Sequence, residues 1–326
     1  MTGRRSNQLS YAPSARASLP GGGDYGTADQ YARGMKLLTY RSERGARAGA
    51  VAGDAVVDVW DALGGESTVR GDGVCAAPGG LRAALEEHRL ERIAEAVAGA
   101  GPAVTLAEAE LLPPITDPQK IICIGLNYAA HAEEAGIDPP AVPTFFAKFA
   151  NALAAPGARV TLPAASEKVD FEAEVAFVIG GRARGLAAGE ALDHVAGYTL
   201  LNDLSARDLQ FATPQWIPGK VFDGSAPCGP WLVTADEAGP ADAIGIALDL
   251  NGERMQESST ADLVFGVAEL VAHLSTLMTL EPGDIVSTGT PAGVGSTREP
   301  RVWLGAGDEL LVSSPELGEL ATTIDR

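Results

Sequence analysis

Short strand-like runs, separated by glycine and proline turns, fill the chain from Lys120 onward and constrain its fold more than any other feature. They include KIICIG, RVTLP, EAEVAFVIG, VAGYTLLND, GPWLVTA, IGIALDLNG, DIVSTG and DELLVSS. One amphipathic pattern interrupts them, with apolar residues at helical spacing between Val267 and Met278. Because strands and helices do not alternate regularly, the pattern disfavours a doubly wound parallel sheet. It predicts a β-rich α+β fold, a roll or barrel with a few helices.

The region before the segment LLPPITDP divides into two parts. Residues 1–34 are rich in Ser, Gly, Ala and Arg and lack periodicity, so we expect a flexible leader there. After it, Gly53 and Asp54 separate two strand-like runs and predict a hairpin, and a helix is expected around residues 81–98. The prolines of LLPPITDP then break regular structure. The predicted domains are a small N-terminal α+β domain over residues 35–115 and a larger domain over residues 119–326.

Charge and cysteine content argue against several classes of protein. The chain has 43 Asp and Glu against 24 Lys and Arg, a net charge of -19, which disfavours binding to nucleic acid or to a membrane surface. No apolar run is long enough to span a bilayer. Cys75, Cys123 and Cys228 are few and far apart, which indicates a reducing compartment rather than a disulfide framework. We therefore expect a cytoplasmic protein.

Residues 168–181 read KVDFEAEVAFVIGG and place carboxylates on a strand-like run. Asp170, Glu172 and Glu174 come at every second position, so they are expected on one face, with apolar residues on the other. Neighbouring carboxylates repel and raise each other's pKa, and a divalent cation between them removes that cost. Hard oxygen ligands suit Mg²⁺, Mn²⁺ or Ca²⁺. The alternative is an exposed, solvated strand face.

A further carboxylate, Asp203 in GYTLLNDLSARDLQ, follows a strand-like run at the point where a chain leaves a sheet. It could complete a facial triad of ligands and leave the remaining coordination positions for water and substrate. Arg207 and Gln210 follow at helical spacing, so a helix would place them on one face with Asp203. The alternative is a surface Asp–Arg pair of little energetic value.

The segment IICIGLNYAAHAEEAG contains His131 and Glu134, whose spacing places both side chains on one side of a helical turn. A carboxylate beside an imidazole fixes the tautomer and raises the basicity of the ring, which suits a general base acting on water. The alternative is an ordinary contact on a helix surface.

Two loops supply the remaining candidate residues. Lys220 lies in IPGKVFDG, and Thr288 and Thr290 lie in the glycine loop of DIVSTGTPAGVG. Glycines at a strand end let backbone N–H groups approach a bound anion, or they form a tight turn. The loop is not a P-loop, because no Gly-Lys-Ser/Thr follows, and it lacks the G-x-G-x-x-G spacing.

The chain resembles the fumarylacetoacetate hydrolase family over residues 119–326. The resemblance rests on the ordered combination of GLNYAAHAEEAG, DFEAEVAFVIG, GYTLLNDLSARDLQ, GKVFDGSAPCGPW and MTLEPGDIVSTGTPAGVG. It extends to the subgroup that includes acylpyruvases and diketo-deoxy-sugar-acid hydrolases. The resemblance implies a mixed β-sandwich roll, preceded by a small N-terminal α+β domain, in a homodimer. The implied reaction is cleavage by water of the carbon–carbon bond of a β-diketo acid, such as an acylpyruvate, a fumarylpyruvate or a diketo-deoxy-sugar acid.

The same resemblance implies a role for each candidate residue, with Mg²⁺, Mn²⁺ or Ca²⁺ as the cofactor and a small diketo acid as the partner. Two alternatives stay open. The first is oxaloacetate decarboxylation or hydroxydienoate isomerisation on the same metal site, and the second is a non-catalytic, metal-stabilised binding protein. The resemblance assigns metal binding to Glu172, Glu174 and Asp203, catalysis to His131, Glu134 and Lys220, and substrate binding to Arg207, Gln210 and Thr290.

Overall fold

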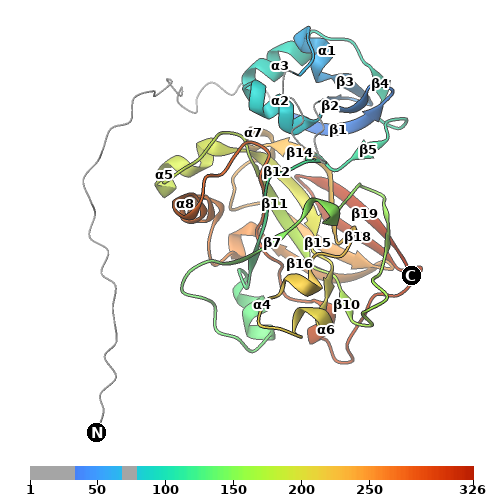
Figure 1. Cartoon of the computed structure of the whole chain (residues 1–326), viewed down its shortest axis with the longest axis vertical. Helices are drawn as coiled ribbons and strands as arrows, with labels where there is room; N and C mark the ends of the chain where they lie inside the picture. Colours follow the sequence, from blue (N-terminus) through green and yellow to red (C-terminus); the bar gives the residue numbers. More distant parts are fainter. Residues whose placement is uncertain (1–33, 68–78) are drawn as a thin grey trace. The chain divides into compact units, whose positions relative to one another are not determined.

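The computed structural model of the chain describes residues 34–67 and 79–326, which belong to one compact unit (Figure 1). The expected leader, apart from Gly34, lies outside the described residues, and so does Cys75. In the described part of the chain, no helix has both the length and the apolar character needed to cross a membrane.

A mixed sheet of 12 strands forms the centre of this unit. Its strands follow the order β4-β3-β2-β1-β14-β12-β11-β17-β6-β7, while β5 pairs with β1 and β8 pairs with β14. Most neighbours are antiparallel, but β17 and β6 are parallel, as are β14 and β8. The strands are β1 (Lys36–Ser42), β2 (Gly45–Ala52), β3 (Ala55–Asp58), β4 (Val104–Thr105), β5 (Leu111–Leu112), β6 (Ile121–Gly125), β7 (Thr144–Lys148), β8 (Leu153–Ala154), β11 (Ala173–Ile179), β12 (Val195–Asn202), β14 (Ala226–Thr234) and β17 (Ile285–Ser287).

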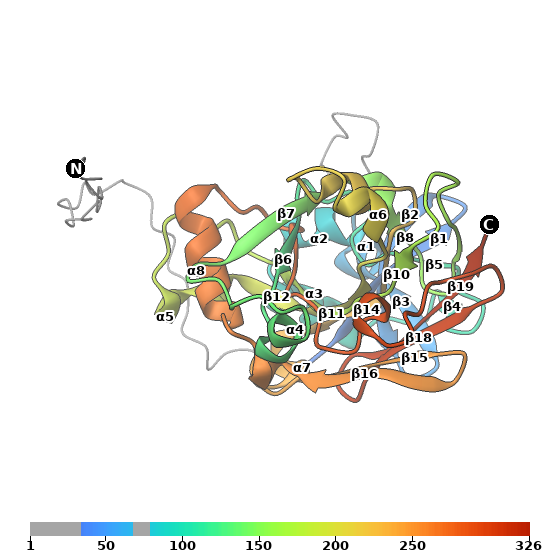
Figure 2. The same ribbon diagram turned by 90° about the horizontal axis from the view of Figure 1, so that it is seen from below.

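A second sheet of five strands has the order β16-β15-β18-β19-β9, and β10 pairs with β13 in a separate ribbon. The main hydrophobic core lies between the two larger sheets, because Phe177 and Leu200 of the first share it with Leu248 and Val312 of the second. Figures 1 and 2 show β15, β16, β18 and β19, coloured orange to red, alongside β11. The strands are β9 (Arg159–Thr161), β10 (Val169–Asp170), β13 (Ser205–Ala206), β15 (Gly245–Leu250), β16 (Glu253–Ser259), β18 (Glu309–Ser314) and β19 (Gly318–Asp325).

The helices are short and lie around the sheets rather than between regularly alternating strands. The first two pack on β2, and α5 packs on α8 (Figure 1). The helices are α1 (Val59–Leu63), α2 (Leu81–Glu87), α3 (Leu90–Ala98), α4 (Ala129–Glu134), α5 (Ala188–Ala191), α6 (Arg207–Gln210), α7 (Ala235–Ala238) and α8 (Val267–Leu277).

This strand-rich mixture of sheets and short helices confirms the predicted β-rich α+β class. The predicted hairpin is also confirmed, because Gly53 adopts a φ of 64° at the turn between β2 and β3, a left-handed conformation that glycine tolerates. The amphipathic pattern near the C-terminus forms α8, which buries Leu270, Val271 and Leu274 as its spacing predicts.

The single helix expected over residues 81–98 is wrong, because this segment forms two helices, α2 and α3. His88 ends the first with an extended backbone, at φ -135° and ψ 144°, and Arg89 begins the second. The ring of His88 packs edge-on against Trp60, with ring centroids 5.8 Å apart. This tertiary contact lies at the break between the two helices, where the apolar periodicity alone suggested continuity.

The region before residue 115 contributes its own strands and helices to the large sheet. Its first strand, β1, pairs with β14, and Leu37 lies opposite Leu232. The side chains of Leu37 and Trp60 share a hydrophobic cluster with Leu232 and Ile285 of the following region. The division into domains over residues 35–115 and 119–326 therefore stays a prediction, since one sheet runs through both.

Candidate active site

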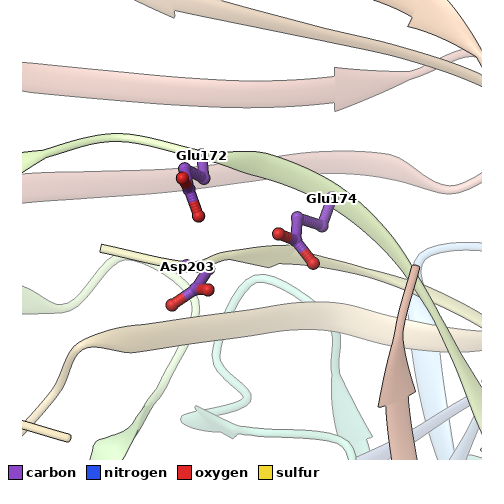
Figure 3. Close-up of side chains that lie close together, drawn as sticks. All are labelled: Glu172, Glu174 and Asp203. Carbon is purple, nitrogen blue, oxygen red and sulfur yellow. The ribbon is translucent and has the colours of Figure 1, made fainter. Parts of the chain in front are cut away.

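Three carboxylates gather at the ends of two neighbouring strands (Figure 3). Glu174 lies in β11, Glu172 comes just before it, and Asp203 directly follows β12. Ala173 of β11 pairs with Asn202 of β12, and Asp203 N–H donates to the Glu172 carbonyl at 2.8 Å. This register brings one oxygen of each carboxylate within 4.8 Å of the others. All three side chains are buried.

The continuous strand expected over the alternating acids is wrong, and Asp170 does not join the cluster. The chain forms β10, which ends at Asp170, and β11, which begins at Ala173, and the former pairs with β13 instead of β12. The carboxylate of Asp170 accepts hydrogen bonds from Gly295 N–H at 2.7 Å and Ser296 N–H at 3.0 Å. Asp170 therefore binds the backbone of the loop at Gly295 and Ser296. It lies apart from the other acids because the pairing of β10 with β13 interrupts the two-residue period that the sequence suggested.

Basic side chains surround the carboxylate cluster. Lys220 Nζ donates to Glu172 at 2.6 Å and to Asp203 at 2.7 Å, and Lys148 Nζ donates to Asp203 at 2.6 Å. Arg207 lies 2.7 Å from the carboxylate of Glu172. Burial disfavours the ionised form of Glu172, but the charges of Arg207 and Lys220 outweigh it and lower the pKa of this carboxyl group.

Glu174 has a different environment from Glu172. Its Oε2 accepts hydrogen bonds from the hydroxyl group of Ser287 and from Gly289 N–H, the latter at 3.1 Å. Burial, followed by the negative charges of Asp203 and Glu172, raises the pKa of Glu174 to about 8. The glycine loop after β17 thus brings a backbone N–H to an anion, and that anion is a carboxylate of the protein itself.

The carboxylate cluster fits a divalent cation. It offers three buried oxygen ligands without a thiolate or an imidazole among them, which is the donor set of hard ions such as Mg²⁺, Mn²⁺ and Ca²⁺. The raised pKa of Glu174 shows that three carboxylates are costly to ionise together at this place. A cation among them would remove that cost.

His131 and Glu134 lie on one turn of α4, as their spacing predicts. His131 Nδ1 is 3.6 Å from the carboxylate of Glu134, which also accepts hydrogen bonds from Gly293 N–H at 3.1 and 3.2 Å. Burial raises the pKa of Glu134, but the contact with His131 and the bonds from Thr297 and Gly293 outweigh it and lower the pKa. Their role as a catalytic pair stays a prediction.

The predicted substrate-binding residues occupy the same region but already have partners. Arg207 donates to Asp170 and, through Nη1, to Gln210 at 2.9 Å, so these two helical neighbours contact each other. Asp203 lies outside α6, and the expected shared helical face is therefore wrong. The Thr290 hydroxyl donates to the Ala173 carbonyl at 3.0 Å.

A cavity of about 470 Å³ joins these groups. Glu172, Glu174, Lys220 and His131 line it, and so do the predicted substrate-binding residues. Aromatic and aliphatic side chains form much of the remaining wall, namely Ile124, Leu126, Ile137, Phe146, Phe211, Trp216 and Trp303. The cavity thus combines two carboxylates of the cluster, the imidazole of His131 and space for a partly apolar molecule.

Two buried side chains near the site carry no role in the sequence interpretation. Lys148 neutralises Asp203, and its only local signal is a single lysine at the end of the apolar run TFFAK. Gln256 accepts from Ala173 N–H at 3.0 Å and donates to the Thr290 hydroxyl at 2.8 Å. No local pattern marks Gln256, because it reaches β11 from β16, far along the chain.

Comparisons with known proteins agree with the fold. The family model described as fumarylacetoacetate (FAA) hydrolase C-terminal matches residues 120–325. The chain is 42% identical over 240 residues to oxaloacetate tautomerase FAHD2B, mitochondrial, from Bos taurus, covering 73% of this chain and 76% of the relative.

Solved structures of two further enzymes are similar along nearly the whole chain. The maleylpyruvate hydrolase from Sphingobium sp. SYK-6 has a TM-score of 0.72 and 31% identity, and the match covers 89% of this chain and 99% of that one. The 2-hydroxyhepta-2,4-diene-1,7-dioate isomerase from Mycobacterium marinum has a TM-score of 0.67 and 29% identity, covering 90% and 98%. The chain therefore belongs to the fumarylacetoacetate hydrolase family.

Proposed function

We propose that this protein is a metal-dependent hydrolase that cleaves the carbon–carbon bond of a β-diketo acid of the acylpyruvate, fumarylpyruvate or diketo-deoxy-sugar-acid type. One observation carries the proposal. The pair of His131 and Glu134 is held together on α4, and His131 lines the same cavity as Glu172 and Glu174. A base beside a cluster of oxygen ligands suits a reaction that activates water and develops enolate charge. The similarity to a maleylpyruvate hydrolase supports it.

The proposed metal ligands are Glu172, Glu174 and Asp203, and the proposed ion is Mg²⁺, with Mn²⁺ or Ca²⁺ as alternatives. A bound ion would supply a Lewis acid for the 2-oxo group of the substrate. The neighbouring residues keep the ligands in place. The hydroxyl group of Ser287 donates a hydrogen bond to Glu174, and Lys148 Nζ donates one to Asp203.

His131 is the proposed general base. Its Nδ1 faces Glu134, which leaves Nε2 to accept a proton from a water molecule. The water oxygen forms a bond to the distal carbonyl carbon, and the bond between that carbon and the methylene carbon breaks. The electron pair passes into the enolate of the pyruvyl fragment, and the imidazolium returns the proton to the methylene carbon. One water is consumed, and the products are a carboxylic acid and pyruvate.

The basic and polar residues of the cavity have proposed roles in binding and charge stabilisation. Lys220 would stabilise the developing oxyanion, since its ammonium group lies among the carboxylates that line the cavity. Arg207, Gln210 and Thr290 would orient the substrate carboxylate. For Arg207 this contact would add to its existing ion pairs with Asp170 and Glu172.

A second candidate is isomerisation of an enolisable 2-oxo acid, and the identity of 42% with an oxaloacetate tautomerase favours it. Such a reaction moves a proton between oxygen and carbon and consumes no water. It would use the same cavity and the same carboxylates. Decarboxylation of oxaloacetate belongs to the same group, since it also develops enolate charge without activated water.

The test is an assay of the purified protein with Mg²⁺ or Mn²⁺ against acylpyruvates, fumarylpyruvate, oxaloacetate and diketo-deoxy-sugar acids. Loss of the enol absorbance and formation of pyruvate are measured separately. Hydrolysis of an acylpyruvate releases pyruvate in step with the absorbance loss, whereas isomerisation removes the absorbance without releasing pyruvate. Glu172→Ala should abolish either activity, and unchanged turnover in this variant would reject the assigned site.

Assembly and location stay proposals. A homodimer is expected from the family, and light scattering of the purified protein would give twice the mass of the chain if the expectation is right. The cytoplasmic location is expected from the few cysteines, of which Cys123 and Cys228 are buried and unpaired in the described residues. The name of the Bos taurus relative contains the word mitochondrial, so fractionation of the source cells is the deciding measurement.

A further inference from the structure

Ala173 lies between the two glutamates of the carboxylate cluster, which project from one stretch of chain (Figure 3). On one side, β11 pairs with β12 along its length, but on the other side its pairing with β17 spans residues 176–178 and does not reach Ala173. Side chains take the place of a strand there. The N–H of Ala173 donates to Oε1 of Gln256 at 3.0 Å, and its carbonyl accepts from the Thr290 hydroxyl at 3.0 Å.

These three residues form a closed ring of hydrogen bonds. Nε2 of Gln256 donates to the Thr290 hydroxyl at 2.8 Å, which completes the ring, and it also donates to the Pro291 carbonyl at 2.9 Å. The side chain of Gln256 is buried, and the residue is 1% exposed. A primary amide offers one acceptor and two donors at once, which neither a carboxylate nor a hydroxyl group can do. The buried ring therefore requires an amide side chain at this position.

The ring also holds the loop that binds Glu174. The loop residues that Gln256 contacts directly follow Gly289, whose N–H donates to the carboxylate of Glu174 at 3.1 Å. Gln256 is thus connected to Glu174 along two routes, through the backbone at Ala173 and through the loop at Gly289. Both routes restrict where this carboxylate can lie relative to the neighbouring glutamate.

A β-bulge directs Gln256 into the protein. Leu248 of β15 pairs with Gln256 of β16, but the next residue, Asp249, pairs with Arg254, so Met255 is an extra residue in β16. Met255 and Gln256 are adjacent and both buried, although successive residues of a regular strand point to opposite faces. Bulges are common beside active sites, where they redirect a side chain. Here the bulge turns a polar amide toward β11.

We propose that Gln256 is a positioning residue that fixes the spacing of Glu172 and Glu174 for a divalent ion. It is not among the described residues that line the cavity, so it acts through Ala173 and Thr290 rather than by contact with an ion or a substrate. The proposal rests on the proposed function, because it takes these carboxylates as metal ligands. Mg²⁺ requires nearly ideal octahedral geometry, whereas Ca²⁺ accepts variable geometry, so a fixed spacing should favour Mg²⁺.

The experiment measures ion binding to the full-length protein by calorimetry, with Gln256→Met as the test variant. Methionine has nearly the same length as glutamine but leaves the Ala173 N–H without its acceptor. The Kd for Mg²⁺ should rise about 10- to 100-fold, the usual effect of removing a group that orients a metal ligand. The Kd for Ca²⁺ should rise less than about threefold, because its coordination adapts to a looser site. A general loss of stability would not change the ratio of the two Kd values.

Two variants serve as controls. Ser275→Ala removes a buried hydroxyl group of α8 that accepts from Leu186 N–H at 3.0 Å, so it too leaves a backbone N–H without its acceptor, at a residue that does not line the cavity. Arg298→Met removes the hydrogen bonds from the guanidinium group to the carbonyls of Gly293 and Met255, which connect the same loop to β16 at a different point. Both variants should lower thermal stability and leave both Kd values near those of the wild type.

Wild-type affinity for Mg²⁺ in Gln256→Met, or equal weakening of Mg²⁺ and Ca²⁺ binding, would overturn the proposal. The same weakening in Arg298→Met would also overturn it, since the effect would then come from a loosened loop. If Gln256→Met does not fold, Gln256→Asn, whose amide is one methylene group shorter, is judged by the same criteria.

Binding measurements separate this inference from the proposed function, because they need no turnover. A wild-type protein that binds Mg²⁺ but hydrolyses no diketo acid refutes the proposed reaction and leaves the comparison of Kd values to decide the role of Gln256. A wild-type protein that binds neither ion overturns both the proposed metal site and this inference.

Discussion

Glu174 has the most costly charge in the site. It is buried beside two other carboxylates, and its hydrogen-bond donors are neutral groups of Ser287 and Gly289, whereas Glu172 and Asp203 contact basic side chains. Its pKa is raised to about 8 from an ordinary value of 4.5. The folded chain therefore keeps this proton at pH values where the unfolded chain has lost it. The free energy of unfolding of the metal-free protein should fall as pH rises from about 4.5 to about 8.

The first prediction concerns the proton on Glu174. Below about pH 8 a divalent ion must displace it, so Mg²⁺ binding at about pH 6.5 should release close to one proton, and release should decline above about pH 8. Calorimetry in two buffers with different ionisation enthalpies measures this number. Glu174→Gln carries no such proton and is the matched control. A proton count near zero for wild-type protein at the lower pH would contradict the prediction.

The second prediction concerns the pair on α4. His131→Ala should lower kcat for acylpyruvate hydrolysis by about 10²–10⁴-fold, because it removes the imidazole that faces Glu134 and is the proposed acceptor of the proton of water. Decarboxylation or isomerisation, which consume no water, should fall less. Glu133→Gln changes one exposed charge on the same helix and should leave both rates unchanged. Equal losses of all activities in His131→Ala would argue against a role in activating water.

Among the elements, β12 matters most because Asp203 directly follows it and because it lies between β11 and β14. Its contact with β14 is very close at Gly197. A Cβ atom built there would lie 2.1 Å from the carbonyl oxygen of Val233, a backbone atom. The close approach of these two strands therefore requires glycine.

The third prediction follows from that contact. Gly197→Ala should lower the free energy of unfolding by about 2 kcal/mol or more, because backbone must move to make room for the methyl group. Gly189→Ala in α5 is the control, since nothing lies within 4 Å of its Cβ position and alanine favours helix. Denaturant unfolding of both variants gives the two values. Similar stability for the two variants would contradict the close packing of β12 on β14.

At the scale of the whole molecule, the site joins segments that are far apart in the sequence. α4 supplies His131, the β11–β12 pair supplies the carboxylates, and Gly289 and Gly293 of one loop donate to Glu174 and Glu134 respectively. These segments meet around the cluster of Glu172, Glu174 and Asp203. An ion bound there would stabilise the assembled fold relative to the unfolded chain, in which the ligands are separated.

The fourth prediction is a metal-dependent shift in thermal unfolding. Mg²⁺ at 100 times its Kd should add about 2.7 kcal/mol to the free energy of unfolding and raise Tm by several degrees. A chelator should reverse the shift. Glu172→Ala lacks one ligand and should show little or no shift at the same concentration. An equal shift in the variant would place the stabilising ion elsewhere.

Much of the fold and part of the site follow from local pattern. The spacing of His131 and Glu134 predicts a shared helical turn, and α4 contains it. The strand predicted around Glu174 is confirmed as β11. The same strand does not extend to Asp170, because Asp170 lies in β10, which pairs with β13. The pattern around Gln256 predicts nothing about the site, because its partners Ala173 and Thr290 are distant in sequence.

The amino-acid sequence by itself determined the strand-rich class, the hairpin at Gly53 and the helical turn of α4. These features depend on backbone conformation and side-chain period over a few residues, which a short segment specifies alone. Only the tertiary structure decided which acids converge, because that depends on the register between β11 and β12 and on the pairing of β10. Contacts between segments far apart in the sequence also gave Asp203 its lysine partners, Lys148 and Lys220.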